Sequence, residues 1–194
     1  MIIKNALTAI EASKTLDLLW DYLENLGTGI DRTNPLTWSD DKWPTCAHGG
    51  IIPSYGIGHS EAQWFVRGVP NVKKAFAKVW ETDDLLTSFD GVSLWRPWNI
   101  DPSWKTQSGQ AWFHIDQHPI SKPGKQCIQG LINLLPTSKE IGGNVVIPKS
   151  HNFFKDIPDE YKERVERLPL DIDHFRFPHD DPKLSSEPAV MAHM

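Results

Sequence analysis

Residues 111–119 read AWFHIDQHP and place two histidines and one aspartate within nine positions. Residues two apart in a strand point to the same face, so a strand here would present His114 and Asp116 together. An imidazole and a carboxylate on one face can bind the same cation. With a second histidine they would form the facial triad of non-haem Fe(II) oxygenases. A hydrogen-bonded pair on an ordinary strand is the alternative, because an H-x-D tripeptide alone is weak evidence for a metal.

Other runs rich in branched and aromatic residues surround this stretch, separated by Gly, Pro and Ser clusters. They predict short strands at VSLWRPW (92–98), AWFHID (111–116), CIQGLINLL (127–135) and GNVVIPKS (143–150). Apolar residues at helical spacing predict a helix within 6–26 and two short helices within 61–89, the second beginning at Pro70. DEYKERVER (159–167) predicts a solvated helix. Helices followed by strands indicate an α+β or mainly β fold.

The composition is that of a soluble globular protein, with 39% hydrophobic and 23% charged residues among 194. The net charge of -5 gives no electrostatic reason to expect nucleic acid or a membrane surface as a partner. No apolar run reaches the roughly 20 residues needed to span a bilayer, and no secretory leader is apparent. Cys46 and Cys127 fit neither a disulfide framework nor a zinc pattern. We therefore expect a cytoplasmic protein, and a structural zinc protein is a weak third alternative.

Two flanking segments give the H-x-D stretch a wider context. SFDGVSLWRPW (88–98) places an arginine between tryptophans, and IGGNVVIPKSH (141–151) places a glycine turn before a strand that ends in Pro-Lys-Ser-His. In the order, spacing and residue types of these three motifs, residues 85–154 resemble the phytanoyl-CoA dioxygenase-like family of Fe(II)/2-oxoglutarate oxygenases. The remaining N-terminal part resembles an uncharacterised branch of that family. The resemblance implies a single oxygenase-like domain over 1–194, with a helical part (1–84), jelly-roll strands (85–154) and a charged helix and tail (155–194).

The resemblance implies a double-stranded β-helix, a cupin-like jelly roll with N-terminal helices. It also implies Fe(II), 2-oxoglutarate and O₂ as cofactors and co-substrates, and a small organic molecule as the substrate to be hydroxylated. His114 and Asp116 match the first two iron ligands. Gln117 matches the family's D-Q and is expected to support the ligands. Trp112, which shares their face, is expected to shape the pocket.

Arg96 and Asn133 are the remaining candidate contacts to the co-substrate. Arg96 lies in the strand before the H-x-D strand and could reach a carboxylate, since its planar fork matches one bidentately. The alternative is a surface arginine stacked on Trp95 or Trp98. Asn133 is an amide within an apolar run, so it needs a partner, which could equally be a neighbouring core group.

The end of the chain departs from the family pattern. The family's third ligand is a histidine on a late strand, followed by an arginine that pairs with 2-oxoglutarate, and neither stands in its usual context here. His193 is the remaining candidate, although it is the penultimate residue. We therefore expect the last core strands to be missing, by truncation or natural loss. The chain would then be a dioxygenase that is inactive by itself, or an inactive jelly-roll binding module. Its exposed sheet edge could pair with that of a second copy in a homodimer.

The glycine-rich stretch from His48 to His59 (HGGIIPSYGIGH) matches neither a P-loop nor a dinucleotide fingerprint. A lid over the mouth of the active site is the interpretation we favour, because loops that exclude water are common over reactive iron centres. A structural surface loop is the alternative.

Overall fold

The computed structural model describes residues 2–105, 113–138, 141, 143–178, 180–186 and 190–191. The chain divides into two compact units, Met1–Ser108 and Gly109–Met194, and each is described by itself. The boundary falls within the predicted 85–154 segment, just before the H-x-D stretch. A single domain over 1–194 stays a prediction.

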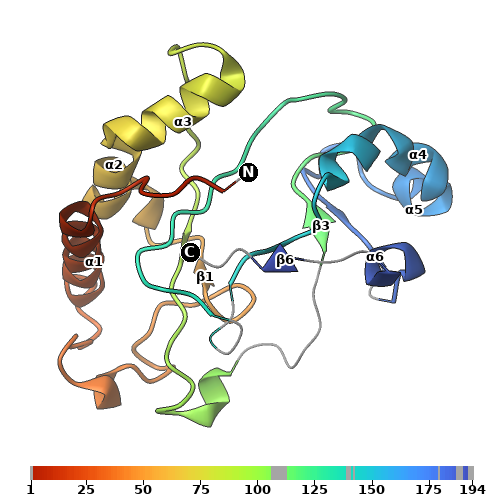
Figure 1. Ribbon diagram of the computed structural model, residues 1–194. Coiled ribbons are helices and arrows are strands. Elements are labelled where there is room, and N and C mark those ends of the chain that lie inside the picture. The colour runs from red at the N-terminus through yellow and green to blue at the C-terminus, as the bar shows by residue number, and fades with distance from the viewer. Residues whose placement is uncertain are drawn as a thin grey trace. The chain divides into compact units, whose positions relative to one another are not determined.

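The first unit contains three α-helices and one strand pair among its described residues (Figure 1). Its elements are α1 (Ala9–Glu24), η1 (Pro35–Thr37), β1 (Ile51–Ile52), η2 (Ile57–His59), α2 (Glu61–Gly68), α3 (Pro70–Trp80), β2 (Val92–Ser93) and η3 (Pro102–Trp104). The helices predicted within 6–26 and 61–89 are confirmed, and α3 begins at Pro70 as expected.

Helix α1 begins at a capping box. The Thr8 hydroxyl accepts the Glu11 amide at 3.2 Å, and the Glu11 carboxylate accepts the Thr8 amide at 2.7 Å. This exchange satisfies two backbone donors that a helix start leaves without partners. Beyond the helix, Arg32 folds back to ion pairs with Asp21 and Glu24, so the loop that follows is tied to the end of α1.

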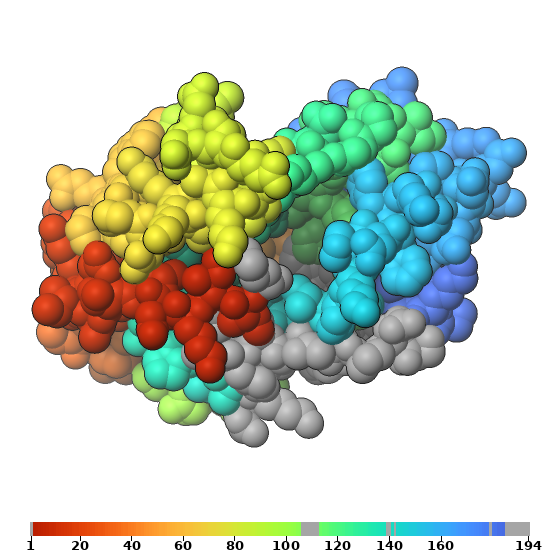
Figure 2. Space-filling model, turned by 45° about the horizontal axis from the view of Figure 1, so that its top comes forward, coloured from red at the N-terminus to blue at the C-terminus, as the bar shows by residue number. Residues whose placement is uncertain are grey.

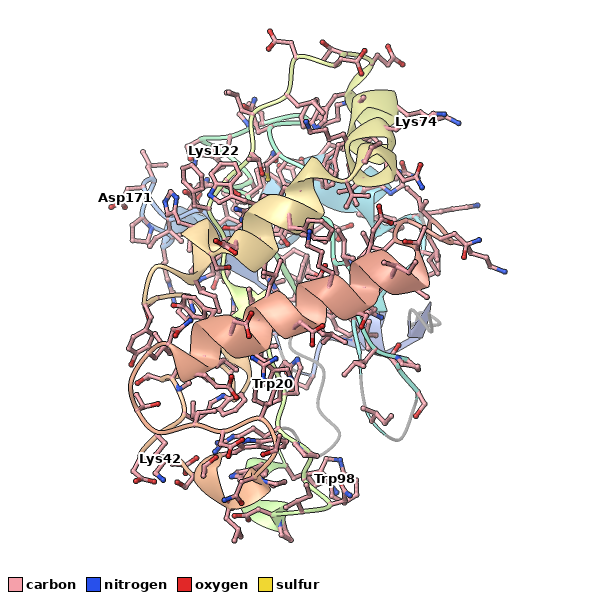
Figure 3. The ribbon with its side chains drawn as sticks, turned by 90° about the vertical axis from the view of Figure 1, so that its left-hand side faces the viewer. Trp20, Lys42, Lys74, Trp98, Lys122 and Asp171 are labelled. Carbon is pink, nitrogen blue, oxygen red and sulfur yellow. The ribbon has the colours of Figure 1, made fainter. Side chains whose placement is uncertain are left out.

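The core of the first unit forms where α1, the following loop and the β1–β2 pair meet. Leu23, Ile30, Trp43, Ile52 and Ile57 make up its buried cluster. Tryptophan side chains gather around it, and Figure 3 shows Trp20 leaving α1 on the side turned away from α2. Its ring centroid lies 5.1 Å from that of Trp38 and 6.3 Å from that of Trp43, and such aromatic pairs stabilise a core beyond their buried area.

The glycine-rich stretch from His48 to His59 contributes to this core. The side chains of Ile52 and Ile57 are 0% and 1% exposed, β1 pairs with β2, and the Tyr22 hydroxyl donates to the Tyr55 carbonyl. A lid must leave its contacts at low cost, whereas this stretch carries two of the most buried side chains of the unit. These contacts favour the structural alternative, and the lid interpretation stays a prediction.

The second unit combines short strand pairs with short helices. Its elements are β3 (His114–Ile115), β4 (Val145–Val146), η4 (Ser150–Asp156), α4 (Ile157–Glu160), α5 (Lys162–Glu166), β5 (Phe175–Arg176), α6 (Pro182–Ser186) and β6 (Val190–Met191). β3 pairs antiparallel with β5, and β4 pairs antiparallel with β6. Ile157, Val165 and Phe175 form the buried cluster, against which the Tyr161 and Phe177 rings pack.

The strands predicted after Gly91 are confirmed only in part. Strands form within 92–98, 111–116 and 143–150, but the described residues 127–135 form none. Leu131 and Leu135 in that segment are 45% and 63% exposed. A strand needs a hydrogen-bonded neighbour, and no described segment pairs with this one. The described sheets are two-stranded, and the jelly-roll core stays a prediction.

Tyr161 connects α4 to α6 through a buried carboxylate. Its hydroxyl donates to Asp181 Oδ2 at 2.7 Å, and the side chain of Asp181 also accepts the Lys183 amide at 2.9 Å. Burial, together with the neighbouring Asp181 carboxylate, raises the pKa of Tyr161 above its usual range. The folded unit therefore keeps a proton that the unfolded chain begins to lose near pH 10.

We expect Tyr161→Phe to lower the free energy of unfolding by about 1–2 kcal/mol at pH 7, because the buried Asp181 carboxylate loses a donor. In the native protein the contribution of Tyr161 is fully present below about pH 10 and falls as the pH rises further, since the folded state then binds more protons. The variant should lose this part of the pH dependence. Urea unfolding at pH 7, 10 and 11 measures both effects.

Tyr55→Phe is the control, because the Tyr55 side chain is exposed and its hydroxyl bonds only at the surface. Its effect should stay within about 0.5 kcal/mol. Equal losses in the two variants would contradict the role assigned to the Tyr161–Asp181 hydrogen bond.

Candidate metal centre

The β3–β5 pair brings the predicted ligand pair to the surface of the second unit. His114 lies opposite Arg176 and Ile115 lies opposite Phe175, and the Phe177 amide donates to the Phe113 carbonyl at 3.1 Å. Ile115 faces the aromatic cluster, which turns the side chains on either side of it the other way. His114 Nε2 then lies 3.5 Å from Asp116 Oδ2, with the two side chains 28% and 36% exposed. The predicted shared face is confirmed.

Asp116 is surrounded by groups that stabilise its charged form. The hydrogen bond from His114 lowers the pKa of Asp116 most; burial opposes this, and smaller lowering contributions come from Gln129 and from the charge of His174. Continuing the β3–β5 register places His174 opposite Asp116. The carboxylate is therefore held anionic, which is the state that binds a metal.

A loop after β3 returns to the carboxylate. Gln129 Nε2 donates to Asp116 Oδ2 at 2.7 Å, and Cys127 Sγ lies 3.6 Å from the Asp116 carbonyl oxygen. Gln129 was not singled out from the sequence. It lies thirteen residues beyond Asp116 in an irregular segment, and neither strand nor helix periodicity relates the two.

His118 is wholly buried just after the pair. Its Nδ1 accepts the backbone amides of Ile120 and Ser121, both at 3.0 Å. Because Nδ1 serves as the acceptor, the proton of the neutral ring must be on Nε2. That Nε2–H is buried and has no hydrogen-bond partner in the described part of the chain. His118 therefore presents no free lone pair to a metal and acts as the centre of a tight turn.

The other predicted site residues have well-defined surroundings. In the first unit, Arg96 donates to the Trp38 carbonyl at 2.6 Å and to Asp40 at 2.5 Å, and its guanidinium lies over the rings of Trp43 and Trp104. A cation–π contact is present, but the alternative was wrong in its details: the partners are not Trp95 or Trp98, and the Arg96 side chain is only 13% exposed. A co-substrate contact from Arg96 stays a prediction.

In the second unit, Asn133 Nδ2 donates to Thr137 Oγ1 at 3.3 Å, so it has the side-chain partner that its amide requires. Gln117 bonds to loop carbonyls and does not bond to the ligand pair. The binding role of Asn133 and the supporting role of Gln117 stay predictions. Trp112 lies outside the described residues.

No group of three or more His, Cys, Asp or Glu side chains that could hold a metal ion is found among the residues described. His114 and Asp116 thus supply two donors, and the exposed His174 does not complete a set. His179 and His193 lie outside the described residues. The same part of the chain contains no helix that is long and apolar enough to cross a membrane.

Two surface hollows of the first unit border α3. One lies where residues 3–6 (red in Figure 2) meet α3 (yellow), and it is lined among others by Lys4, Lys74 and Lys78. The other lies at the C-terminal end of α3, beside Glu81 and Asp83. None of the predicted site residues lines either hollow.

Two curated proteins are similar to this chain. It is 33% identical over 184 residues to "Ava biosynthesis cluster protein O" of Aspergillus versicolor, covering 93% of this chain and 57% of that protein. It is 26% identical over 192 residues to a Dictyostelium discoideum protein named "Putative phytanoyl-CoA dioxygenase", covering 80% of this chain and 53% of that protein. The chain thus spans about half the length of these relatives. No family model and no solved structure matches it.

Proposed function

We propose that this chain carries the iron-binding pair of an Fe(II)- and 2-oxoglutarate-dependent dioxygenase that hydroxylates a small organic molecule. The observation that carries the proposal is the 3.5 Å approach of His114 Nε2 to Asp116 Oδ2 on one face of β3. The name of the Dictyostelium relative supports a dioxygenase. The jelly-roll fold, the substrate class and the full set of ligands belong to the same proposal.

The two donors suit an iron ion in type and in spacing. Imidazole nitrogen and carboxylate oxygen are two of the three ligands of the 2-His-1-carboxylate triad. Donors about 2.1 Å from a metal at neighbouring octahedral positions are about 3 Å apart, so a small adjustment of the 3.5 Å pair would accommodate the ion. Both side chains are part-exposed, which leaves the metal open to further ligands.

Iron bound here would supply the activation of O₂ with 2-oxoglutarate, which splits into succinate and CO₂ as the substrate is hydroxylated. The chain itself supplies orientation. The β3–β5 pair fixes the direction of both ligands, and the bond from Gln129 favours the anionic form of the Asp116 carboxylate. The third protein ligand would come from outside the described residues, where His193 is one candidate.

A catalytically inactive binding module is the second candidate function. It is favoured by the finding that the described residues bring only two donors together. Two protein ligands hold a metal weakly, because affinity depends on the number of ligands and on the groups that support them.

An anaerobic titration of the full chain with Fe(II) and 2-oxoglutarate tests the proposal. We expect the visible charge-transfer band of the bound chelate to appear at near-stoichiometric iron. Asp116→Ala should weaken iron binding by about 100-fold or more, beyond the 10- to 100-fold that loss of a supporting group typically costs. Ser121→Ala, a change in the turn beyond the pair, is the control. A folded chain that shows no band, or an Asp116 variant that binds as before, would refute the dioxygenase proposal and favour the binding module.

A further inference from the structure

The side-chain amide of Gln129 holds the carboxylate of the proposed iron ligand. Its Nε2 donates to Asp116 Oδ2 at 2.7 Å, a distance typical of a well-formed hydrogen bond. An amide N–H group cannot itself bind a metal, and being neutral it leaves the negative charge on the carboxylate. A lysine or arginine in this place would compete with the metal for that charge.

Gln129 belongs to a loop and not to a helix or strand. Buried contacts within that loop bring it to this position. Gln117 is 8% exposed. Its Nε2 donates to the carbonyls of Lys122 and Gly124 at 2.5 and 2.6 Å, and its Oε1 accepts the Gln126 amide at 3.4 Å. The buried Gln117 side chain therefore bonds to several backbone groups of the loop. These bonds direct the chain back toward Asp116.

His118 fixes the start of the same loop. Besides the two amides that its Nδ1 accepts, its carbonyl accepts the Lys122 amide at 3.1 Å. The ring is 0% exposed, so its orientation is set by packing as well as by these bonds. The turn after the ligand strand is thus rigidly built before the chain reaches Gln129.

We propose that Gln129 is the positioning residue of the metal centre. It orients the Asp116 carboxylate for monodentate binding, and it is held in place by the loop that Gln117 and His118 organise. This inference rests on the proposed function, since it assigns Gln129 a role only if Asp116 binds a metal. Groups that hydrogen-bond to metal ligands typically contribute 10- to 100-fold to metal affinity.

The test uses Co(II), whose visible absorption reports binding, with the full chain and matched glutamine variants. Gln129→Leu removes the donor at similar size. We expect it to weaken Co(II) binding by about 10- to 100-fold. Gln126→Leu is the control, because that side chain bonds only to the Pro123 carbonyl at 3.0 Å. Its Co(II) affinity should remain within about twofold of the native value.

A second measurement uses the metal-free native chain and needs no Gln129 variant to fold. The side-chain NH₂ resonance of Gln129 in an NMR spectrum should move when Asp116 is replaced by alanine, while that of Gln126 should not. A Gln129 resonance that does not move, or native Co(II) affinity in Gln129→Leu, overturns the inference and leaves the proposed function intact. Failure of the native chain to bind either Co(II) or Fe(II) overturns the proposed function, and the inference with it.

Discussion

Replacing Phe175 by alanine is expected to lower the free energy of unfolding of the second unit by about 3–5 kcal/mol. Phe175 is 1% exposed, lies opposite Ile115 in the β3–β5 pair, and has its ring centroid 5.1 Å from that of Phe177 and 5.7 Å from that of Tyr161. The variant loses both the transfer free energy of a large ring and these packed contacts. Such a loss is a large part of the total stability of a small domain.

The measurement is urea unfolding followed by far-UV circular dichroism, with Phe153→Ala as the matched control in the same unit. Phe153 is 54% exposed, so its truncation should cost less than about 1 kcal/mol. If the two variants unfold at the same urea concentration, the core of the second unit is not where the structure places it. A destabilised β3–β5 pair would also disorder the His114–Asp116 pair.

Gly91→Ala is expected to destabilise the first unit by about 3 kcal/mol. A Cβ atom at this position would lie 2.2 Å from the Ile52 carbonyl oxygen and 2.9 Å from its carbon. Both are backbone atoms of β1, so this steric overlap can be removed only if β1 and β2 separate. Since Ile52 is 0% exposed, that shift would also disturb the core.

Gly68→Ala at the end of α2 is the control for this prediction, because a Cβ there meets no atom within 4 Å. It should be neutral or stabilising by about 0.4–1 kcal/mol, since alanine restricts the unfolded chain. Thermal unfolding of the two variants gives the comparison. A Gly91 variant as stable as the Gly68 variant would contradict the close approach of the two strands.

The helices of the first unit were predictable because each combines apolar periodicity with a local start signal. Thr8 and Glu11 form the capping box of α1, and Pro70 occupies the first turn of α3. These signals are encoded within a few neighbouring residues. The segment 127–135 has strand-like composition and yet pairs with no described segment, because strand formation depends on a partner that composition does not identify.

The candidate site, too, was predictable only where local sequence periodicity determines it. Alternation along a strand placed His114 and Asp116 on one face, and the structure agrees. Gln129 reaches Asp116 through a loop whose path depends on the buried contacts of Gln117 and His118, and no periodicity reports such a path. Arg96 was expected beside tryptophans, but its partners Trp43 and Trp104 are brought to it by tertiary packing.

The chain contains nine tryptophans, and all but Trp112 belong to the first unit. Three of them, Trp20, Trp38 and Trp43, have ring centroids within 6.4 Å of each other, which is close enough for excitation energy to pass between the indoles. Excited above the tyrosine absorption, the fluorescence of this protein therefore reports almost entirely on the first unit. The second unit has Tyr161 beside Phe175 and Phe177. Two of the chain's three tyrosines, Tyr22 and Tyr55, also belong to the first unit, whereas the second unit has Trp112. The change in tryptophan emission on unfolding therefore follows mainly the first unit, without any added label.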